Sequence, residues 1–222
     1  MPSTTNEQRQ PTNPRRWGVY LITDRAQTGG RPLLDVVAAA LDGGVRAVQL
    51  RERDLPTRAL YTLAEALRQL TTRAGAALLI NDRVDVALAC DADGVHLPAH
   101  GMTIADARTL LGAQRLIGVS THAASEVGAA AAAGADFAVV GPIFDTPSKR
   151  VFGAPLGVDA LAAARAAAPR LPLFAIGGVD ATHVAALHRA GADGVALIRA
   201  VLAAADPQRA ARQLLDALPA TE

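Results

Sequence analysis

The sequence predicts an α/β fold, a single (β/α)8 barrel, and two observations lead to this fold class. The first is a repeated pattern: an Ala-rich helical stretch, a turn containing Gly or Asp, and a short apolar run typical of a buried strand. Its clearest copies are residues 38–50, 87–97, 129–140 and 187–198. The second is that eight apolar runs alternate with helical patterns and show no hairpin signals. This favours a closed parallel sheet, with an open doubly wound sheet as the alternative.

Each predicted strand is short, apolar and followed by a helical pattern. A Gly near the end of several predicted helices can adopt the left-handed conformation that terminates a helix, and a strand follows directly. The expected strands are 17–22, 46–51, 77–80, 94–97, 115–119, 137–141, 172–176 and 194–198. We therefore expect one barrel domain over residues 17–217. Residues 1–16 are polar and rich in Pro, and we expect them to form a disordered tail.

Composition limits the partners and the compartment. Half of the 222 residues are hydrophobic and only 3% are aromatic, which predicts a core of Ala, Val, Leu and Ile. The net charge of +1, without a long block of one sign, argues against nucleic acid or a membrane surface as a partner. Cys90 is the only cysteine, which excludes an intrachain disulfide and fits a reducing cytoplasm. No secretory signal or membrane-spanning run is evident, and the sequence is compatible with a homo-oligomer.

Polar residues that directly follow the predicted strands are the candidates for chemistry, because barrel enzymes place their catalytic groups at these strand ends. Gln49 and Arg51 alternate with apolar neighbours, so both point toward the upper rim of the barrel lumen. Arg53 adds a second cation, and an anion is the natural ligand. The alternative is that Arg51 forms a structural ion pair with Glu52 or Asp82.

Asp82 follows Asn81 at the end of the predicted third strand. A carboxylate beside basic residues can hold Mg²⁺ through oxygen and leave coordination sites for water and a substrate phosphate. The helix that follows begins near Arg83, and Asp is also a favoured N-cap residue. Metal binding and helix capping therefore both explain this residue.

Two further segments are candidates for phosphate binding. The long loop after the sixth strand contains Lys149 and Arg150 and could close over a ligand, or be a solvated loop without a ligand. Gly177–Gly178 follow the seventh strand, where barrels often bind phosphate through backbone N–H groups. A tight turn without a ligand would explain the two glycines equally.

His122 lies two residues beyond Ser120, at the end of the predicted fifth strand. It is the histidine placed for proton transfer, since imidazole titrates near neutral pH, and a structural role is the alternative. No His-x-His or His-Glu-x-x-His spacing occurs, so a zinc hydrolase is not expected.

Ordered motifs resemble thiamine phosphate synthases and their TenI-like thiazole tautomerase relatives over residues 17–217. They are YLITD at 20–24, QLRER at 49–53, LINDRVDVAL at 79–88, ADGVHL at 92–97, IGVSTH at 117–122 and VGPIFDTPSK at 140–149. The resemblance implies a barrel that joins hydroxymethylpyrimidine diphosphate to a thiazole phosphate with Mg²⁺ and releases diphosphate.

The resemblance also implies roles for individual residues. Asp82 matches a Mg²⁺ ligand, and Ser120 matches a serine near the bond being formed. The matches to diphosphate contacts are Gln49, Arg51, Asn81 and Lys149. The matches to thiazole-phosphate contacts are Thr146, Ser148, Gly178 and the backbone at Leu197 and Ile198.

Two departures from the synthase pattern keep other functions open. Residues 96–102 read HLPAHGM where synthases have HLGQ followed by two acidic positions, so a second acidic Mg²⁺ ligand is missing. This segment and the RER sequence are similar to TenI-like tautomerases, in which a histidine matching His122 moves the proton. The retained Asn81–Asp82 pair and the 140–149 motif favour the synthase. A non-catalytic, phosphate-binding regulatory barrel is the third hypothesis.

Overall fold

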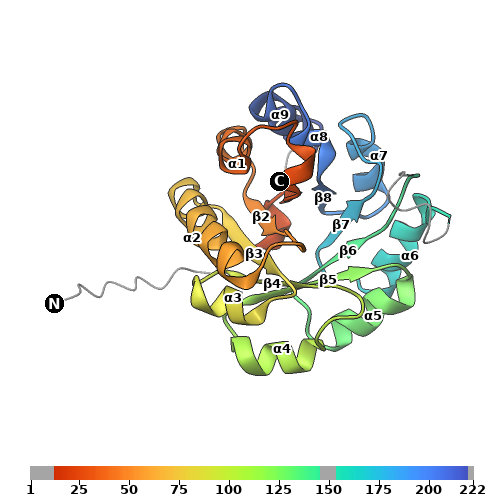
Figure 1. Ribbon diagram of the computed structural model, residues 1–222. Coiled ribbons are helices and arrows are strands. Elements are labelled where there is room, and N and C mark those ends of the chain that lie inside the picture. Colours follow the sequence, from red (N-terminus) through yellow and green to blue (C-terminus); the bar gives the residue numbers. More distant parts are fainter. Residues whose placement is uncertain (1–12, 146–153, 220–222) are drawn as a thin grey trace.

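The computed structural model describes residues 13–145 and 154–219. Its strands form a closed parallel barrel in chain order, which confirms the predicted fold class (Figure 1). Each strand lies within two residues of its predicted bounds. The strands are β1 (Val19–Ile22), β2 (Ala47–Leu50), β3 (Ala77–Asn81), β4 (Gly94–Leu97), β5 (Leu116–Thr121), β6 (Phe137–Val140), β7 (Leu173–Ile176) and β8 (Gly194–Leu197).

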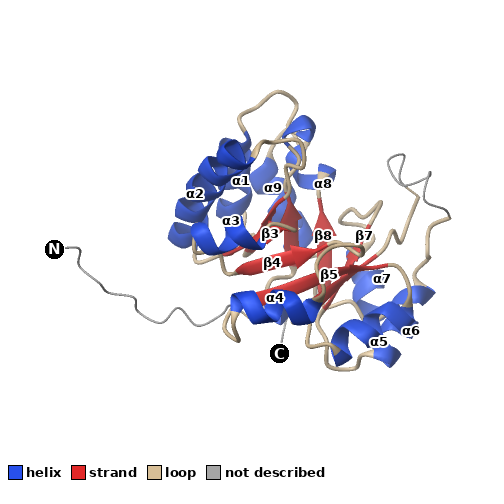
Figure 2. Ribbon diagram, turned by 60° about the horizontal axis from the view of Figure 1, so that its bottom comes forward, coloured by secondary structure: helices blue, strands red, loops and turns tan. Residues whose placement is uncertain are grey.

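Helices surround the barrel on its outer side, as Figure 2 shows. They are α1 (Leu33–Asp42), α2 (Thr57–Ala74), α3 (Val84–Ala89), α4 (Ile104–Leu111), α5 (Ala124–Ala132), α6 (Asp159–Ala167), α7 (Val184–Arg189), α8 (Arg199–Leu202) and α9 (Pro207–Asp216). The layer between helices and strands is built from Val, Leu, Ile and Ala, as the composition predicted. Across the described ranges, each helix is too short or too polar to cross a lipid bilayer.

The barrel lumen has a different core, made of aromatic side chains. Trp17, Tyr20, Phe137 and Phe174 are buried there and contact one another, with Trp17 and Phe137 ring centroids 5.2 Å apart in an edge-to-face arrangement. Such pairs add stability beyond the burial of their area. Glycine makes room for them: a Cβ atom on Gly118 would lie 2.1 Å from Cζ of Phe137.

Three aspartates bind the strands together at the N-terminal end of the barrel. Asp93, Asp136 and Asp193 stand directly before β4, β6 and β8. Each carboxylate accepts a hydrogen bond from the backbone N–H of a residue in the preceding strand, at 2.7 to 2.8 Å. Each carboxylate also forms an ion pair with an arginine. These are Arg68 of α2, Arg108 of α4 and Arg165 of α6, each in the helix that leads into the strand whose N–H is bound. These charge-assisted bonds tie β3 to β4, β5 to β6 and β7 to β8.

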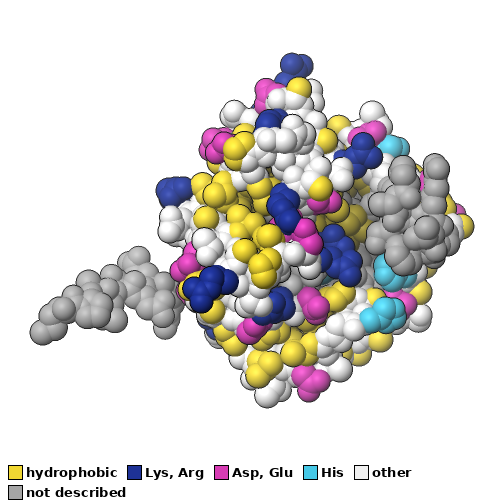
Figure 3. All heavy atoms as spheres, in the orientation of Figure 1, with side chains coloured by type: hydrophobic (Ala, Val, Ile, Leu, Met, Phe, Trp, Pro, Cys, Tyr) yellow, Lys and Arg dark blue, Asp and Glu magenta, His cyan; other side chains and the backbone are white. Residues whose placement is uncertain are grey.

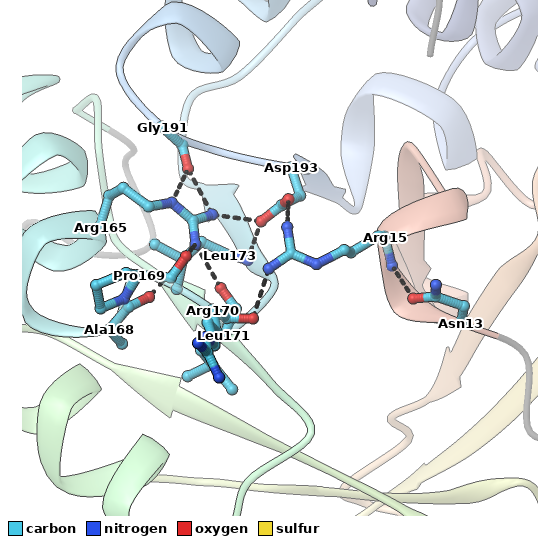
Figure 4. A network of polar contacts seen from close by, with 10 residues as sticks. All are labelled: Asn13, Arg15, Arg165, Ala168, Pro169, Arg170, Leu171, Leu173, Gly191 and Asp193. Atoms are coloured by element: carbon cyan, nitrogen blue, oxygen red, sulfur yellow. Dashed lines mark hydrogen bonds and ion pairs between the residues drawn. The ribbon is translucent and has the colours of Figure 1, made fainter. Parts of the chain in front are cut away.

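The N-terminal segment is ordered from an earlier residue than expected. Pro14–Arg16, which the sequence placed in the tail, form a 3-10 helix capped by Asn13. Figure 4 shows Arg15 and Arg165 reaching Asp193 from different elements, and Arg15 also donates to the carbonyl of Arg170. The partly buried carboxylate of Asp193 thus anchors Arg15, which lies outside the barrel strands.

Alanine substitutions at two glycines, one beside the aromatic lumen and one within a helix, should change the free energy of unfolding in opposite directions. Gly118→Ala should lower the free energy of unfolding by about 1–3 kcal/mol, because the new methyl group would overlap the buried ring of Phe137. Gly128 lies within α5, where a Cβ atom would meet its nearest neighbours at 3.6 Å. Gly128→Ala should therefore raise the free energy of unfolding by about 0.5–1 kcal/mol. Denaturant unfolding measures both, and equal effects would contradict this account of the lumen.

Candidate active site

The C-terminal ends of the strands face the viewer in Figure 1. In the same orientation, Figure 3 shows basic and acidic side chains gathered near the middle of this face. The loops that follow β2, β3 and β5 place several predicted site residues here. Thr146, Ser148 and Lys149, which the resemblance assigns to substrate contacts, lie outside the described residues.

Arg51 is a half-buried cation directly after β2. Its backbone N–H donates to Oγ1 of the buried Thr23 at 2.9 Å, which fixes the chain at this point. Its guanidinium forms no hydrogen bond or ion pair with any residue of the described ranges. The ion pairs with Glu52 or Asp82 that were the alternative are therefore absent, because Glu52 pairs with Arg25 instead. Within the described ranges, the guanidinium of Arg51 is therefore unpaired.

The electrostatics of Arg51 reflect this position. Burial lowers the pKa of the guanidinium, and the neighbouring Arg53 lowers it further, while Asp24 and Glu52 act in the opposite direction. Arginine nevertheless stays charged in proteins. A bound anion would compensate both the desolvation of this cation and its repulsion by Arg53.

One cavity of about 170 Å³ brings together residues from the loops after β2 and β3. It contains four residues that the sequence assigned to anion or metal binding: Arg51, Arg53, Asn81 and Asp82. The complete lining is Leu50, Arg51, Glu52, Arg53, Leu55, Leu60, Asn81, Asp82 and Arg83. Three arginines face two carboxylates here, so the cavity suits a negatively charged ligand.

Asp82 has an exposed side chain and an unusual backbone conformation, with φ of 62°. Its backbone N–H donates to the carbonyl of His96 at 2.9 Å. The N-cap position of α3 belongs to Arg83, which has no side-chain cap bond, so Asp82 does not cap this helix. A strained conformation in a non-glycine residue often marks a functional position.

The carboxylate of Asp82 packs against the segment after β4. A Cβ atom on Gly101 would lie 2.9 Å from Oδ1 of Asp82, so the segment that lacks the second acidic residue packs against this carboxylate. Within the described ranges, no group of three or more His, Cys, Asp or Glu side chains could enclose a metal. Mg²⁺ commonly binds through one or two carboxylates and takes its other ligands from water and substrate phosphates.

A chain of polar contacts crosses the lumen below the cavity. Nε2 of Gln49 donates to the hydroxyl of Tyr20 at 3.0 Å, and this hydroxyl lies 3.5 Å from Nδ1 of His96. Nε2 of His96 lies 2.9 Å from Oγ of Ser120. Burial lowers the pKa of His96 to about 3, and nearby Arg51 lowers it too, so the imidazole is neutral at physiological pH. The Tyr20 proton can then point to Nδ1, and Nε2–H donates to Ser120.

This chain adds two residues that the sequence did not assign to the site, Tyr20 and His96. Gln49 is only 1% exposed, and its amide nitrogen is directed at Tyr20. Ser120 is half-buried and held by His96. The alternation that placed Gln49 in the lumen applies equally to Tyr20 and His96, and it could have identified them.

His122 is held by its backbone and by one side of its ring. Its backbone N–H donates to Glu126, and Nδ1 lies 2.5 Å from the carbonyl oxygen of Gly141. Because a carbonyl only accepts, Nδ1 carries the proton in the neutral ring and Nε2 is the basic nitrogen. His122 thus has a structural contact and also a nitrogen able to accept a proton.

Gly177 and Gly178 have positive φ angles of 101° and 66°. A Cβ atom on Gly178 would lie 2.7 Å from Cβ of Phe144, so these glycines let the loop after β6 pack on the loop after β7. Leu197 ends β8 and is buried, and Ile198 leads into α8. Phosphate binding by Gly178, Leu197 and Ile198 stays a prediction.

The burial of His96 predicts how stability depends on pH. The folded-state pKa of about 3 lies below the ordinary value of 6.5, so the unfolded chain takes up a proton that the folded chain refuses. The contribution is complete above pH 6.5 and is lost as the pH falls toward 3, at no more than about 1.4 kcal/mol per pH unit.

Denaturant unfolding of the wild type and of His96→Asn at pH 7.5, 6 and 5 tests this. The free energy of unfolding of the wild type should fall more steeply with decreasing pH than that of the variant. His188→Asn, at an exposed position of α7, should follow the wild type. Parallel curves for the wild type and His96→Asn would show that His96 is not buried in its neutral form.

Comparison with known proteins agrees with this geometry. The family described as Thiamine monophosphate synthase matches residues 19–201. The chain is 56% identical to a Geobacter sulfurreducens protein provisionally named a thiamine-phosphate synthase, over 91% of this chain and 95% of that protein. It is 45% identical to the thiamine-phosphate synthase of Moorella thermoacetica, over 90% and 94% of the two chains.

A solved structure shows the same fold. The thiamine phosphate pyrophosphorylase of Pyrococcus furiosus superposes with a TM-score of 0.83 at 34% identity, covering 92% of this chain and 96% of that one. Family match, sequence identity and fold agree over nearly the whole barrel. The chain therefore belongs to the thiamine monophosphate synthase family.

Proposed function

We propose that this chain is a thiamine-phosphate synthase, a transferase that joins hydroxymethylpyrimidine diphosphate to a thiazole phosphate and releases diphosphate. The observation that carries this proposal is the half-buried guanidinium of Arg51, which has no acidic partner in the described ranges and lines a cavity with Asn81 and Asp82. The names of the relatives support the same activity.

The residues of the cavity have an electrostatic role in this reaction. Diphosphate gains negative charge as its bond to the pyrimidine methylene group breaks, and fixed cations lower the energy of that state. Arg51 and Arg53 supply positive charge, and the amide of Asn81 supplies a hydrogen-bond donor. We assign Lys149, from the loop after β6, to the same group. Gln49, which the resemblance matches to a diphosphate contact, is buried below the cavity and donates to Tyr20, so we assign it to the support of the site.

Asp82 would hold Mg²⁺, and the bound metal would neutralise part of the diphosphate charge. An exposed carboxylate without an ion pair in the described part of the chain suits a metal that shares its coordination with substrate phosphates. Ser120, held by His96, would contact the substrate near the new bond. Gly178, Leu197 and Ile198, with Thr146 and Ser148, would bind the thiazole phosphate.

The one cysteine, Cys90, is buried and free, which fits a cytoplasmic location.

A second candidate is isomerisation of the thiazole, as in TenI-like tautomerases. The observation that favours it is the orientation of His122, whose Nδ1 is bound to Gly141 and whose Nε2 is left to accept a proton. Gly101, beside Asp82 where a second acidic ligand was expected, favours it as well. Arg51 and Asp82 favour the synthase, since isomerisation needs no diphosphate site.

The proposal predicts that two substitutions reduce coupling strongly. Purified protein is incubated with both phosphorylated substrates and Mg²⁺, and thiamine phosphate and diphosphate are measured. Arg51→Met should lower kcat/KM about tenfold to a hundredfold, the range expected when a hydrogen-bonded charge is lost. Asp82→Asn should raise the Mg²⁺ concentration needed for activity.

The control is Arg115→Met, which removes an arginine paired with Asp91 at the opposite end of the barrel and should keep full activity. Isomerisation of the thiazole without coupling would support the tautomerase. Diphosphate binding with neither reaction would support the regulatory barrel. Full coupling by both Arg51→Met and Asp82→Asn would refute the site.

A further inference from the structure

We propose that Arg25, in the loop after β1, is a positioning residue that keeps the anion site cationic by binding the two carboxylates of the loop that contains Arg51. These carboxylates are Glu52 and Asp54. This inference rests on the proposed function, because it takes Arg51 as the residue that binds diphosphate. It adds a residue outside the cavity that determines whether Arg51 is available.

Arg25 contacts Glu52 in two ways. Its backbone N–H donates to both carboxylate oxygens of Glu52, at 3.1 and 3.2 Å. Its guanidinium donates to Oε2 of Glu52 at 3.0 Å. The side chain of Glu52 is only 3% exposed. A carboxylate at this depth is stable only with a cation or several hydrogen-bond donors, and Arg25 supplies both.

The same guanidinium holds Asp54 through two parallel hydrogen bonds, one of them 2.7 Å from Nη1 to Oδ1. This fork geometry is the arrangement in which arginine binds a carboxylate most specifically. One arginine therefore occupies both acidic groups of the loop after β2. The arginines that line the cavity from this loop, Arg51 and Arg53, have no acidic partner in the described ranges.

Removal of the Arg25 side chain would change the charge at the cavity more than the path of the chain. Glu52 would keep its two backbone bonds, and Arg51 would keep its bond to Thr23. Glu52 would lose its cation, however, and its negative charge already acts on Arg51. It would then attract the guanidinium of Arg51 and repel an anionic ligand. The electrostatic role can thus be separated from a purely structural one.

The test is binding of inorganic diphosphate, measured by isothermal titration calorimetry with the wild type, Arg25→Met, Glu52→Gln and the double variant. Arg25→Met should weaken binding about tenfold at low salt, the scale of one uncompensated charge at a partly buried site. Glu52→Gln alone should stay within about threefold of the wild type, because Arg25 can still bond to the amide oxygen. The double variant should recover to within about threefold, since it lacks the competing carboxylate.

Two further readouts separate charge from folding. The effect of Arg25→Met should shrink as salt is added, because salt screens exposed charges. In turnover assays it should raise KM for the diphosphate substrate more than it lowers kcat. Arg25→Lys should restore part of the affinity. Arg115→Met should bind diphosphate as the wild type does, and thermal unfolding shows whether each variant is folded.

The outcomes that overturn the inference are distinct from those that overturn the proposed function. Wild-type affinity in Arg25→Met, or a double variant as weak as Arg25→Met, would show that Arg25 acts only on loop structure or not at all. A wild type that does not bind diphosphate, or an Arg51→Met variant that binds equally well, would remove the anion site itself. That result would overturn both proposals.

Discussion

Closure of the eight strands in register is the constraint on which the rest of this molecule depends. Val19–Leu21 of β1 pair with Val195–Leu197 of β8, which leaves no free edge and brings the C-terminal ends of all strands to one rim. Arg51 and Asp82 follow the paired strands β2 and β3 and line one cavity, while Ser120, in β5, contacts His96 of β4. The paired aspartates and arginines at the opposite end add hydrogen bonds between strands, and these hold the register that the rim requires.

The two ends of the barrel use charge in opposite ways. At the N-terminal end, Asp93, Asp136 and Asp193 each bind an arginine and a backbone N–H, so their charges are compensated within the protein. At the C-terminal end, Arg51 is half-buried without an acidic partner in the described ranges. A half-buried cation without an acidic partner lowers the free energy of unfolding, and binding of an anion beside it would offset this loss. This contrast supports the proposal that the rim binds an anion.

The sequence predicted the strands and the rim because both follow from local patterns. Short apolar runs define the strands, and alternation within β2 places Gln49 in the lumen. Which charged residues form ion pairs with one another does not follow from local patterns, and here the sequence left alternatives open. Glu52 follows Arg51 directly, yet it pairs with Arg25 from another loop, because the barrel brings these loops together. The aromatic lumen was not predicted either, since a low aromatic content does not show that four such residues will meet. Arg15 likewise pairs with Asp193, which lies far along the chain.

The segment 96–102 is where the resemblance to synthases places a second acidic Mg²⁺ ligand, and its backbone explains why this chain has none there. Asp82 adopts a left-handed conformation, and Gly101 lies so close that a Cβ atom would come within 2.9 Å of its carboxylate and 2.8 Å of Cδ of Pro98. The contact with Asp82 therefore depends on the absence of a side chain at position 101. An acidic residue placed there would have to displace the turn before it could reach a metal. The missing second carboxylate and the close approach of this turn are thus one structural feature, and any Mg²⁺ bound by Asp82 must take more of its coordination from water and substrate oxygens.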